Sequence, residues 1–219
     1  MISIRLVSLS KYFNYTDRVI DIGCDHALLD IYLIEHKVLK NMIVSDIHEG
    51  ALKQGIDNIK KASLEEKIDT RLGNGLEVLN KKDNVNTILI SGMGASTIVS
   101  ILENEYVNNI NKMIIQSNND HELLREEVCK LGFKITHEEF LIDNKKSYIN
   151  IVFERGNSNY NKNQLKYGPI LMHNRNYLRY QMDYLNNILN KIPNNKLLIK
   201  FKLKREIRKL RNFEKNIDK

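Results

Sequence analysis

Short apolar runs alternate with longer stretches in which apolar residues recur every three or four positions through the first part of the chain. The short runs predict β-strands and the longer stretches predict helices. Their regular alternation favours βαβ units around a parallel sheet over a sandwich of antiparallel strands. The predicted strands are residues 18–22, 42–46, 68–72, 87–91 and 112–116, and the predicted helices are residues 27–36, 50–62, 75–80, 95–105 and 121–131.

The pattern changes after the fifth predicted helix. Two extended runs, residues 134–142 and 147–154, flank the segment Asp143-Asn144-Lys145-Lys146, whose composition is typical of a turn. This order predicts a β-hairpin. Five alternating units followed by an antiparallel pair resemble the strand order of class I methyltransferases. This resemblance implies a Rossmann-like α/β fold with a seven-stranded sheet, in which the last strand lies beside the fifth.

A small, polar segment over residues 156–163 follows the predicted β-hairpin and reads as a hinge. We therefore expect an α/β domain over residues 1–156 and an extension over residues 157–219. Within the extension, Pro193 and two asparagines interrupt a helical pattern, which predicts an antiparallel helical hairpin packed as a coiled coil. The apolar positions expected to pack there are Leu171, Leu178, Met182, Leu185, Ile188, Leu189, Leu197, Phe201, Ile207 and Leu210.

The net charge of +7 is divided unevenly along the chain. Residues 1–155 carry 19 Lys and Arg against 23 Asp and Glu, whereas residues 156–219 carry 15 against 4. A tail this basic favours a polyanionic partner such as nucleic acid, because Lys and Arg displace the counterions condensed on phosphates. The alternative is a solvated helical surface.

No apolar run is long enough to span a membrane, and the first ten residues do not resemble a signal peptide. The two cysteines, Cys24 and Cys129, form no CxxC pair. These features predict a cytoplasmic protein without disulfides.

The sharpest local signal is the segment Val19-Ile20-Asp21-Ile22-Gly23-Cys24-Asp25-His26-Ala27, a strand that enters a helix through an acidic, glycine-containing turn. Gly23 allows the backbone to pass close to a ligand, and the helix behind it offers free N–H groups. A dinucleotide site would need two further glycines, and the chain has Asp25 and Leu28 there. Asp25 would repel a pyrophosphate but suits the ammonium and sulfonium groups of S-adenosylmethionine. We expect Asp21, Gly23 and Cys24 to bind that cofactor.

Further candidate cofactor ligands follow the next strands. Asp46 and Ile47 stand where α/β nucleotide sites bind ribose hydroxyls. Asn74 and Gly75 follow the third strand, and the Asn74 amide can both donate and accept at an adenine edge. Gly92 permits close backbone approach after the fourth strand, where Met93 could pack on adenine or a target base.

The segment Gln116-Ser117-Asn118-Asn119 ends the fifth strand, at the sheet edge where ligands bind in such folds. The six histidines show no metal-ligand spacing, and no Ser, His and Asp are arranged as a nucleophilic triad. Neither a metal site nor covalent catalysis is expected.

Taken together, these motifs resemble class I methyltransferases, and one family in particular. The string from Asp21 to Ala27, the Gly73-Asn74-Gly75-Leu76 turn, the Gly92-Met93-Gly94 loop, the Gln116-Ser117-Asn118 strand end and the C-terminal hairpin resemble the bacterial tRNA (adenine-N1)-methyltransferases that modify adenine 22 in the D-arm. The chain departs from the family pattern at Asp30 and Ser117, where proline is common, and at Asn74, where an acid is frequent.

The resemblance implies methyl transfer from S-adenosylmethionine to N1 of adenine in tRNA, with the hairpin helping to hold the RNA. A homodimer through the C-terminal hairpin is a separate expectation. Adenine N1 is paired or stacked in folded RNA, so the base must be exposed and held. Asp25, His26 and Asn118 are the candidate catalytic residues, and Asp25 would stabilise the cationic ring or accept a proton. The alternatives are methylation of another RNA or a small molecule, and a non-catalytic RNA-binding protein.

Overall fold

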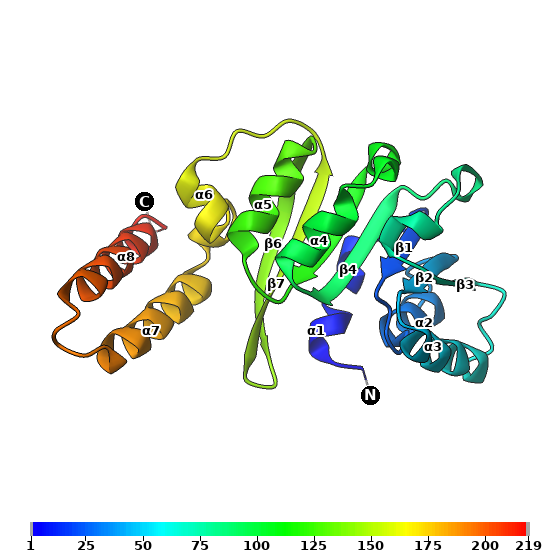
Figure 1. Cartoon of the computed structure of the whole chain (residues 1–219), viewed down its shortest axis with the longest axis horizontal. Coiled ribbons are helices and arrows are strands. Elements are labelled where there is room, and N and C mark those ends of the chain that lie inside the picture. The colour runs from blue at the N-terminus through cyan, green and yellow to red at the C-terminus, as the bar shows by residue number, and fades with distance from the viewer. Residues whose placement is uncertain (1, 218–219) are drawn as a thin grey trace. The chain divides into compact units, whose positions relative to one another are not determined.

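A seven-stranded mixed sheet forms the centre of the first part of the chain, in a computed structural model that describes residues 2–217 (Figure 1). The strands are β1 Val19–Ile22, β2 Met42–Asp46, β3 Ile68–Leu72, β4 Thr87–Met93, β5 Lys112–Ser117, β6 Phe133–Asp143 and β7 Lys146–Arg155, in the order β3-β2-β1-β4-β5-β7-β6. The first five are parallel, and β7 pairs antiparallel with both β5 and β6. The predicted fold class and the place of the last strand beside the fifth are confirmed.

The chain order reverses between β1 and β4, which lie side by side although β2 and β3 separate them in sequence. Successive crossovers run to opposite sides at this point, so a crevice opens outside the carboxyl ends of the two strands. β1 and β5 are buried along their whole length. Burial on both faces explains why their apolar residues do not alternate with polar ones, as they do in half-exposed strands.

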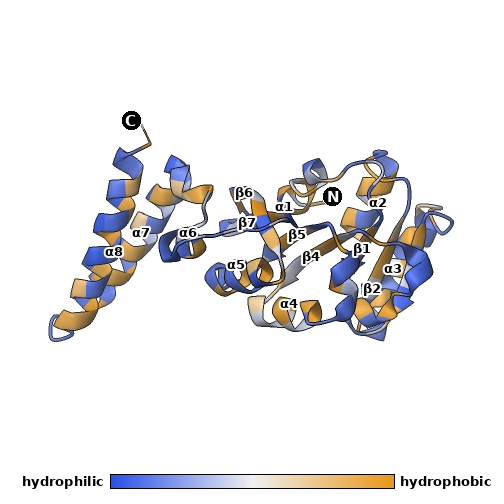
Figure 2. Cartoon of the chain, turned by 90° about the horizontal axis from the view of Figure 1, so that it is seen from above, coloured by the Kyte–Doolittle hydropathy of each residue, from blue (hydrophilic) through white to orange (hydrophobic). Residues whose placement is uncertain are grey.

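Helices cover both faces of the sheet (Figure 2). Helix α4, Ala95–Leu102, contacts α5, His121–Lys130, on one face, and α2, Leu28–Glu35, contacts both α1, Ile4–Val7, and α3, Glu49–Lys61, on the other. The helix predicted over residues 75–80 is wrong, because only a single 3₁₀ turn forms over Gly75–Val78. Gly75 has a φ of +56°, which is incompatible with a continuing right-handed helix. α1 was not predicted, since one helical turn has no measurable period.

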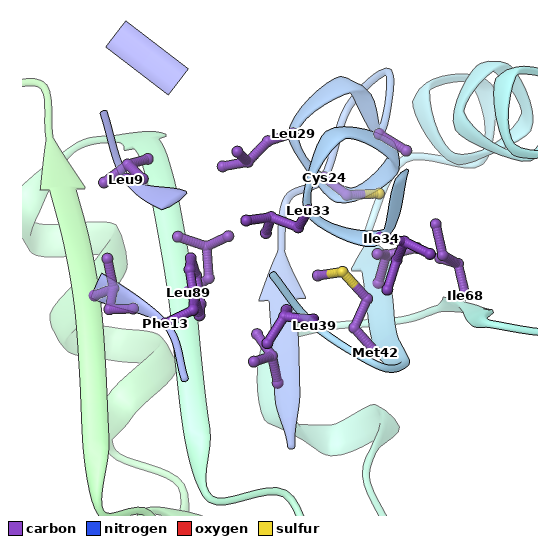
Figure 3. Close-up of a cluster of buried hydrophobic side chains, with 14 of the residues drawn as sticks. Leu9, Phe13, Cys24, Leu29, Leu33, Ile34, Leu39, Met42, Ile68 and Leu89 are labelled. Carbon is purple, nitrogen blue, oxygen red and sulfur yellow. The ribbon is translucent and has the colours of Figure 1, made fainter. Parts of the chain in front are cut away.

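The apolar core on the α2 face is shown in Figure 3. Leu9 and Phe13, from the segment after α1, pack with Leu33 of α2 and Leu89 of β4 in one cluster. Each fully buried large side chain stabilises the fold by about 1.5–3 kcal/mol. The residues before β1 are therefore part of the core, which fixes α1 against the sheet.

The β6–β7 hairpin turns at Asn144 and Lys145, whose φ values are +48° and +64°. Two consecutive residues with positive φ are the mark of a type I′ turn, which matches the right-handed twist of the paired strands. Asp143 and Lys146 close the hairpin on either side. The predicted hairpin is confirmed.

Residues 160–217 form a separate compact unit, with the boundary after Asn159. It contains α6, Lys162–Tyr167, a 3₁₀ turn over Leu171–His173, and the long helices α7, Arg175–Lys191, and α8, Leu197–Lys215. α7 and α8 pack against each other as the predicted helical hairpin. α6 lies partly in the segment read as a hinge and was not predicted; Asn161 caps it by accepting from the backbone N–H groups of Asn163 and Gln164.

The packing of the helical hairpin differs from the prediction at its tip. Leu178 and Leu210 are fully buried, but Leu197 and Phe201 are 71% and 67% exposed. The apolar stripe of α8 therefore packs only in its second half, because its first turns extend past the buried part of α7. Within residues 2–217, no helix is both long and apolar enough to cross a membrane.

Candidate active site

A cavity of about 900 Å³ opens at the carboxyl ends of β1, β2 and β4. This volume is that of a site for a cofactor or a small ligand. It lies at the chain reversal between β1 and β4, where ligands bind in open α/β sheets. The predicted residues that line it are Asp21, Gly23, Cys24, Asp25, His26, Asp46, Ile47, Asn74, Gly75, Gly92 and Met93.

The loop after β1 has an unusual backbone conformation. Asp25 and Ala27 have φ values of +49° and +53°, in the left-handed region that side chains other than glycine rarely adopt. Helix α3 supports this loop: the Asn58 Nδ2 donates to the His26 carbonyl at 2.9 Å, and a Cβ on Gly55 would stand 3.1 Å from the Asp25 carbonyl oxygen. Strained backbone of this kind persists only where its surroundings fix it. The Asp25-His26 loop is therefore held in place by α3.

Gly23 brings the ends of β1 and β4 together. Its φ is +80°, and a Cβ at this position would lie 2.2 Å from the Met93 Cε. No L side chain fits without displacing Met93. The glycine requirement thus comes first from the positive φ, because the end of the flexible Met93 side chain can move aside.

Asp46 at the end of β2 connects two loops of the cavity. Its carboxylate accepts from the Asp25 backbone N–H at 3.3 Å and from the His48 backbone N–H at 2.8 Å. Each carboxylate oxygen has further lone pairs, so the group can still accept from a ligand hydroxyl. Ile47 beside it is 59% exposed, an apolar surface at the rim.

Two buried carboxyl groups meet beneath the cavity. Asp21 lines it, and Asp30, in the first turn of α2, is fully buried behind it. Among the described residues, Asp21 Oδ1 and both Asp30 oxygens have no hydrogen-bond donor. Burial, followed by the charge of Asp30, raises the pKa of Asp21 well above its usual value, and burial raises the pKa of Asp30 to about 7. The pair holds a proton near neutral pH, and that proton can bridge the two groups.

Asp25 and His26 form the exposed polar pair of the site. The His26 Nε2 lies 3.5 Å from the Asp25 Oδ2, and both side chains reach solvent. Burial, followed by the charge of Asp21, raises the pKa of the neighbouring Cys24 thiol. A thiol held protonated is a poor nucleophile, so Asp25 and His26 are the groups in this loop that can act on a substrate.

The remaining predicted residues lie at the edges of the site. Asn74 donates to Glu77 Oε1 at 3.1 Å and lines the cavity beside Gly75. Asn118 does not line it: its Nδ2 donates to the Gly92 carbonyl at 2.5 Å, and its backbone N–H donates to the Met93 carbonyl at 2.8 Å. The position of Asn118 thus favours support of the β4 end over contact with the cavity.

Several cavity residues were missed by the sequence analysis. Ser96, Thr97 and Ile101 of α4 line the cavity, as does Arg5 of α1. The α4 residues could have been inferred from the Gly-Ala-Ser start of that helix, but Arg5 is far from every motif in sequence. Among residues 2–217, no group of His, Cys, Asp and Glu side chains is arranged to hold a metal ion.

The sheet order is that of the Rossmann-like fold of class I methyltransferases, and the cavity lies at the edge of the sheet where such folds bind ligands. The model of the tRNA (adenine(22)-N(1))-methyltransferase family matches residues 19–217. The chain therefore belongs to this family, and the predicted resemblance is confirmed.

Individual relatives agree with this assignment. The tRNA (adenine(22)-N(1))-methyltransferase of Bacillus subtilis (strain 168) is 31% identical over 157 residues, which cover 71% of this chain and 66% of that protein, slightly less than two thirds of its length. The structure of Streptococcus pneumoniae Sp1610 in complex with S-adenosyl-L-methionine is 29% identical, with a TM-score of 0.85 and coverage of 98% and 100% of the two chains. That of M. capricolum TrmK with S-adenosyl-homocysteine is 29% identical, with a TM-score of 0.82 and 99% coverage of both chains.

Proposed function

We propose that this protein transfers a methyl group from S-adenosylmethionine to N1 of adenine 22 in tRNA. The observation that carries the proposal is the cavity at the β1–β4 reversal, where Asp21 and Asp46 from two strand ends meet an exposed Asp25-His26 pair. Membership of the family and the bound cofactor in the Sp1610 and TrmK structures support it. The alternatives, another RNA, a small molecule or a protein without turnover, have no comparable support.

The residues of the cavity fit this cofactor. Asp21 Oδ1 is buried without a donor among the described residues, so it can accept from an ammonium group. Asp46 is fixed by two backbone N–H groups and suits a ribose hydroxyl. Asn74 can read an adenine edge, and Gly23 leaves the backbone accessible. A cation near Asp21 would also favour its ionised form, against the effect of burial.

S-adenosylmethionine supplies the methyl carbon, which adenine N1 attacks with its lone pair while the carbon–sulfur bond breaks and its electrons remain on sulfur. The chain's residues position the base and exclude water, which is most of what such a displacement requires. The ring becomes cationic, and Asp25 stabilises that charge or accepts a proton from the exocyclic amine. His26 orients Asp25 or contacts the base, and Asn118 supports the Gly92 backbone at the same edge.

Helix α8 carries a basic stripe that suits a phosphate backbone. Lys204, Arg208, Arg211 and Lys215 are all exposed and follow one another at spacings of four, three and four residues. This spacing places them on one helix face over about 16 Å. Ile207 and Leu210, which lie beside this stripe around the helix, are buried. We propose that this stripe contacts the phosphates of tRNA. The basic character of residues 156–219, which carry 15 Lys and Arg against 4 Asp and Glu, supports this role.

The tip of the same hairpin supports the predicted homodimer. Leu197, Leu198 and Phe201 are 71%, 80% and 67% exposed, an apolar group at the start of α8. Exposed apolar groups of this kind often mark protein interfaces. Sedimentation equilibrium of the wild type and Phe201→Lys tests this: a dimer that the substitution converts to monomer supports it, and a monomeric wild type rejects it.

The assigned roles are separable by variants. Asp25→Asn keeps a residue that tolerates positive φ, so it removes the charge without adding backbone strain. We expect a single-turnover methylation rate at least about ten-fold lower with S-adenosylhomocysteine affinity unchanged. Arg208→Gln with Arg211→Gln should lower tRNA affinity and reduce the slope of log K against log salt by about 2, one unit for each phosphate that is no longer neutralised.

The control for the basic stripe is the double variant Lys81→Gln with Lys82→Gln. Both lysines are exposed and lie outside the helical hairpin, so this variant removes the same charge from another part of the chain. A normal rate in Asp25→Asn would remove Asp25 from catalysis. Equal salt slopes in the α8 and control variants would remove the stripe from RNA binding.

A further inference from the structure

Arg5 is the cavity residue for which the proposed reaction has no role. It lies in the single turn of α1 and is held there from both sides: its backbone N–H donates to Asp143 Oδ2 at 3.2 Å, and its carbonyl accepts from the Ser8 hydroxyl at 2.7 Å. Its guanidinium carbon lies 5.1 Å from the centre of the Tyr148 ring, within cation–π range. The side chain is thus fixed between α1 and the β6–β7 hairpin.

A buried chain of amides sets the direction of the guanidinium. Arg5 Nη1 donates to Gln116 Oε1 at 2.8 Å, and Gln116 in turn donates to Asn150 Oδ1. Asn150 donates to the Ser8 hydroxyl at 2.8 Å and to Glu139 Oε2 at 3.1 Å. Gln116 and Asn150 are fully buried. Buried polar groups whose hydrogen bonds are all made to one another rigidify their surroundings. The orientation of the Arg5 side chain is therefore fixed.

The charge of Arg5 is not neutralised within the described part of the chain. No carboxylate there lies within ion-pair distance of its guanidinium, and Nε and Nη2 have no acceptor among those residues. Its partners are a neutral amide and an aromatic ring. Among the described residues that line the cavity it is also the sole Lys or Arg, and Asp21, Asp25 and Asp46 line the same cavity.

The guanidinium lies where the end of β4 borders the cavity. Arg5 Nη1 would lie 3.8 Å from a Cβ built on Gly92, at the end of β4. A cavity lined by three aspartates repels anions, so an anionic group can enter only where a fixed cation offsets that field. Guanidinium groups with two free donors bind carboxylates and phosphates in a forked geometry.

We propose that Arg5 is the oxyanion-binding residue of this site. The oxyanion comes from one of two sources: the carboxylate on the amino-acid part of the cofactor, or a phosphate next to the target adenine. The inference rests on the proposed function for the identity of these ligands, but contact with an oxyanion is a property of Arg5 that can be measured without turnover.

The test uses the full-length protein with Arg5→Gln, Arg5→Lys and the control Arg18→Gln. Arg18 is exposed immediately before β1 and does not line the cavity, so its replacement removes the same charge away from the site. Calorimetry measures the affinity for S-adenosylhomocysteine, which has the carboxylate, and for methylthioadenosine, which lacks it. Single-turnover methylation of tRNA at saturating cofactor gives the apparent KM and the maximal rate. Arg5→Lys keeps the charge without the fork and covers the case in which Arg5→Gln does not fold.

If the source is the cofactor carboxylate, Arg5→Gln lowers the affinity for S-adenosylhomocysteine by about ten-fold or more and leaves the affinity for methylthioadenosine unchanged. If it is a phosphate, both nucleoside affinities are unchanged and the KM for tRNA rises by about ten-fold, with partial recovery in Arg5→Lys. Unchanged affinities and KM in folded Arg5→Gln or Arg5→Lys would overturn the inference. A wild type that binds S-adenosylhomocysteine through Arg5 but methylates no tRNA would reject the proposed function and leave the inference standing.

Discussion

Replacing Asp30 by Asn should make the fold more stable at alkaline pH and less sensitive to pH. Asp30 is fully buried beside Asp21, and neither of its oxygens has a hydrogen-bond donor among the described residues. An Asn at this position has the same shape, carries no charge, and its amide can donate to Asp21. The substitution therefore removes a like-charge contact and supplies a missing hydrogen bond.

The magnitude follows from the pKa of Asp30, which burial raises from 3.8 to about 7. At 1.36 kcal/mol for each pKa unit, ionising Asp30 in the folded protein costs up to about 4 kcal/mol relative to the unfolded chain. The folded state keeps a proton that the unfolded state has released, so the free energy of unfolding falls as pH rises. This contribution is complete below pH 3.8 and is lost as pH rises to about 7. We expect Asp30→Asn to raise the unfolding free energy at pH 8 by about 2–4 kcal/mol.

The assay is urea unfolding at pH 5.0 to about 8.5, without cofactor, because a bound ligand would add its own stabilisation. Asp57→Asn, an exposed residue of α3, is the matched control. The curve of unfolding free energy against pH should flatten in Asp30→Asn alone. Parallel curves for the wild type and Asp30→Asn, or a less stable variant at pH 8, would refute the account of the buried pair.

Three further substitutions test the supports of the fold and the site. Glu138→Gln should lower the unfolding free energy by about 3 kcal/mol in urea titrations, because it breaks the fully buried 2.7 Å ion pair with Arg125, and a loss under about 1 kcal/mol would contradict this. Asp120 has a φ of +42° and caps α5. In thermal unfolding, Asp120→Ala should lower the unfolding free energy by about 1–2 kcal/mol and Asp120→Asn by much less. Equal losses in the two variants would show that neither the cap nor the positive φ is the cause. Asn58→Ala removes the hydrogen bond to His26 and should slow single-turnover methylation by about ten-fold with little change in melting temperature, whereas a normal rate would show that the loop holds without it.

The parts of the fold that the sequence predicted are those with a strong local signal. β1 and β5 were recognisable as short, largely apolar runs because both faces of these strands are buried. The loop from Gly23 to Ala27 was recognisable because its glycine and acid follow such a run. The sequence also predicted that Asp46 and Gly92 lie at the same edge of the sheet, because the carboxyl ends of parallel strands lie on the same side.

The parts that were missed depend on tertiary contacts. Arg5 belongs to a single helical turn, which has no period, and its role arises from Gln116, more than 100 residues away in sequence. A helix was predicted from Gly75 onward, but Gly75 has a positive φ and Leu79 is extended, so only one 3₁₀ turn forms. Phe201 has the spacing of a packed residue but is exposed, because the buried residues of α7 and α8 lie at the other end of the hairpin, away from the turn. The assignment of residue roles within the cavity stays a prediction.

The central claim is that this cavity methylates N1 of adenine 22, and transfer from labelled S-adenosylmethionine to two unmodified tRNA transcripts tests it most directly. One transcript carries adenine at position 22, and the other carries guanine there, with its partner changed to keep the fold. We predict 1-methyladenosine in the first, detected by nucleoside mass spectrometry, and no label in the second. Equal labelling of both transcripts, or a labelled nucleoside other than 1-methyladenosine, would contradict the account.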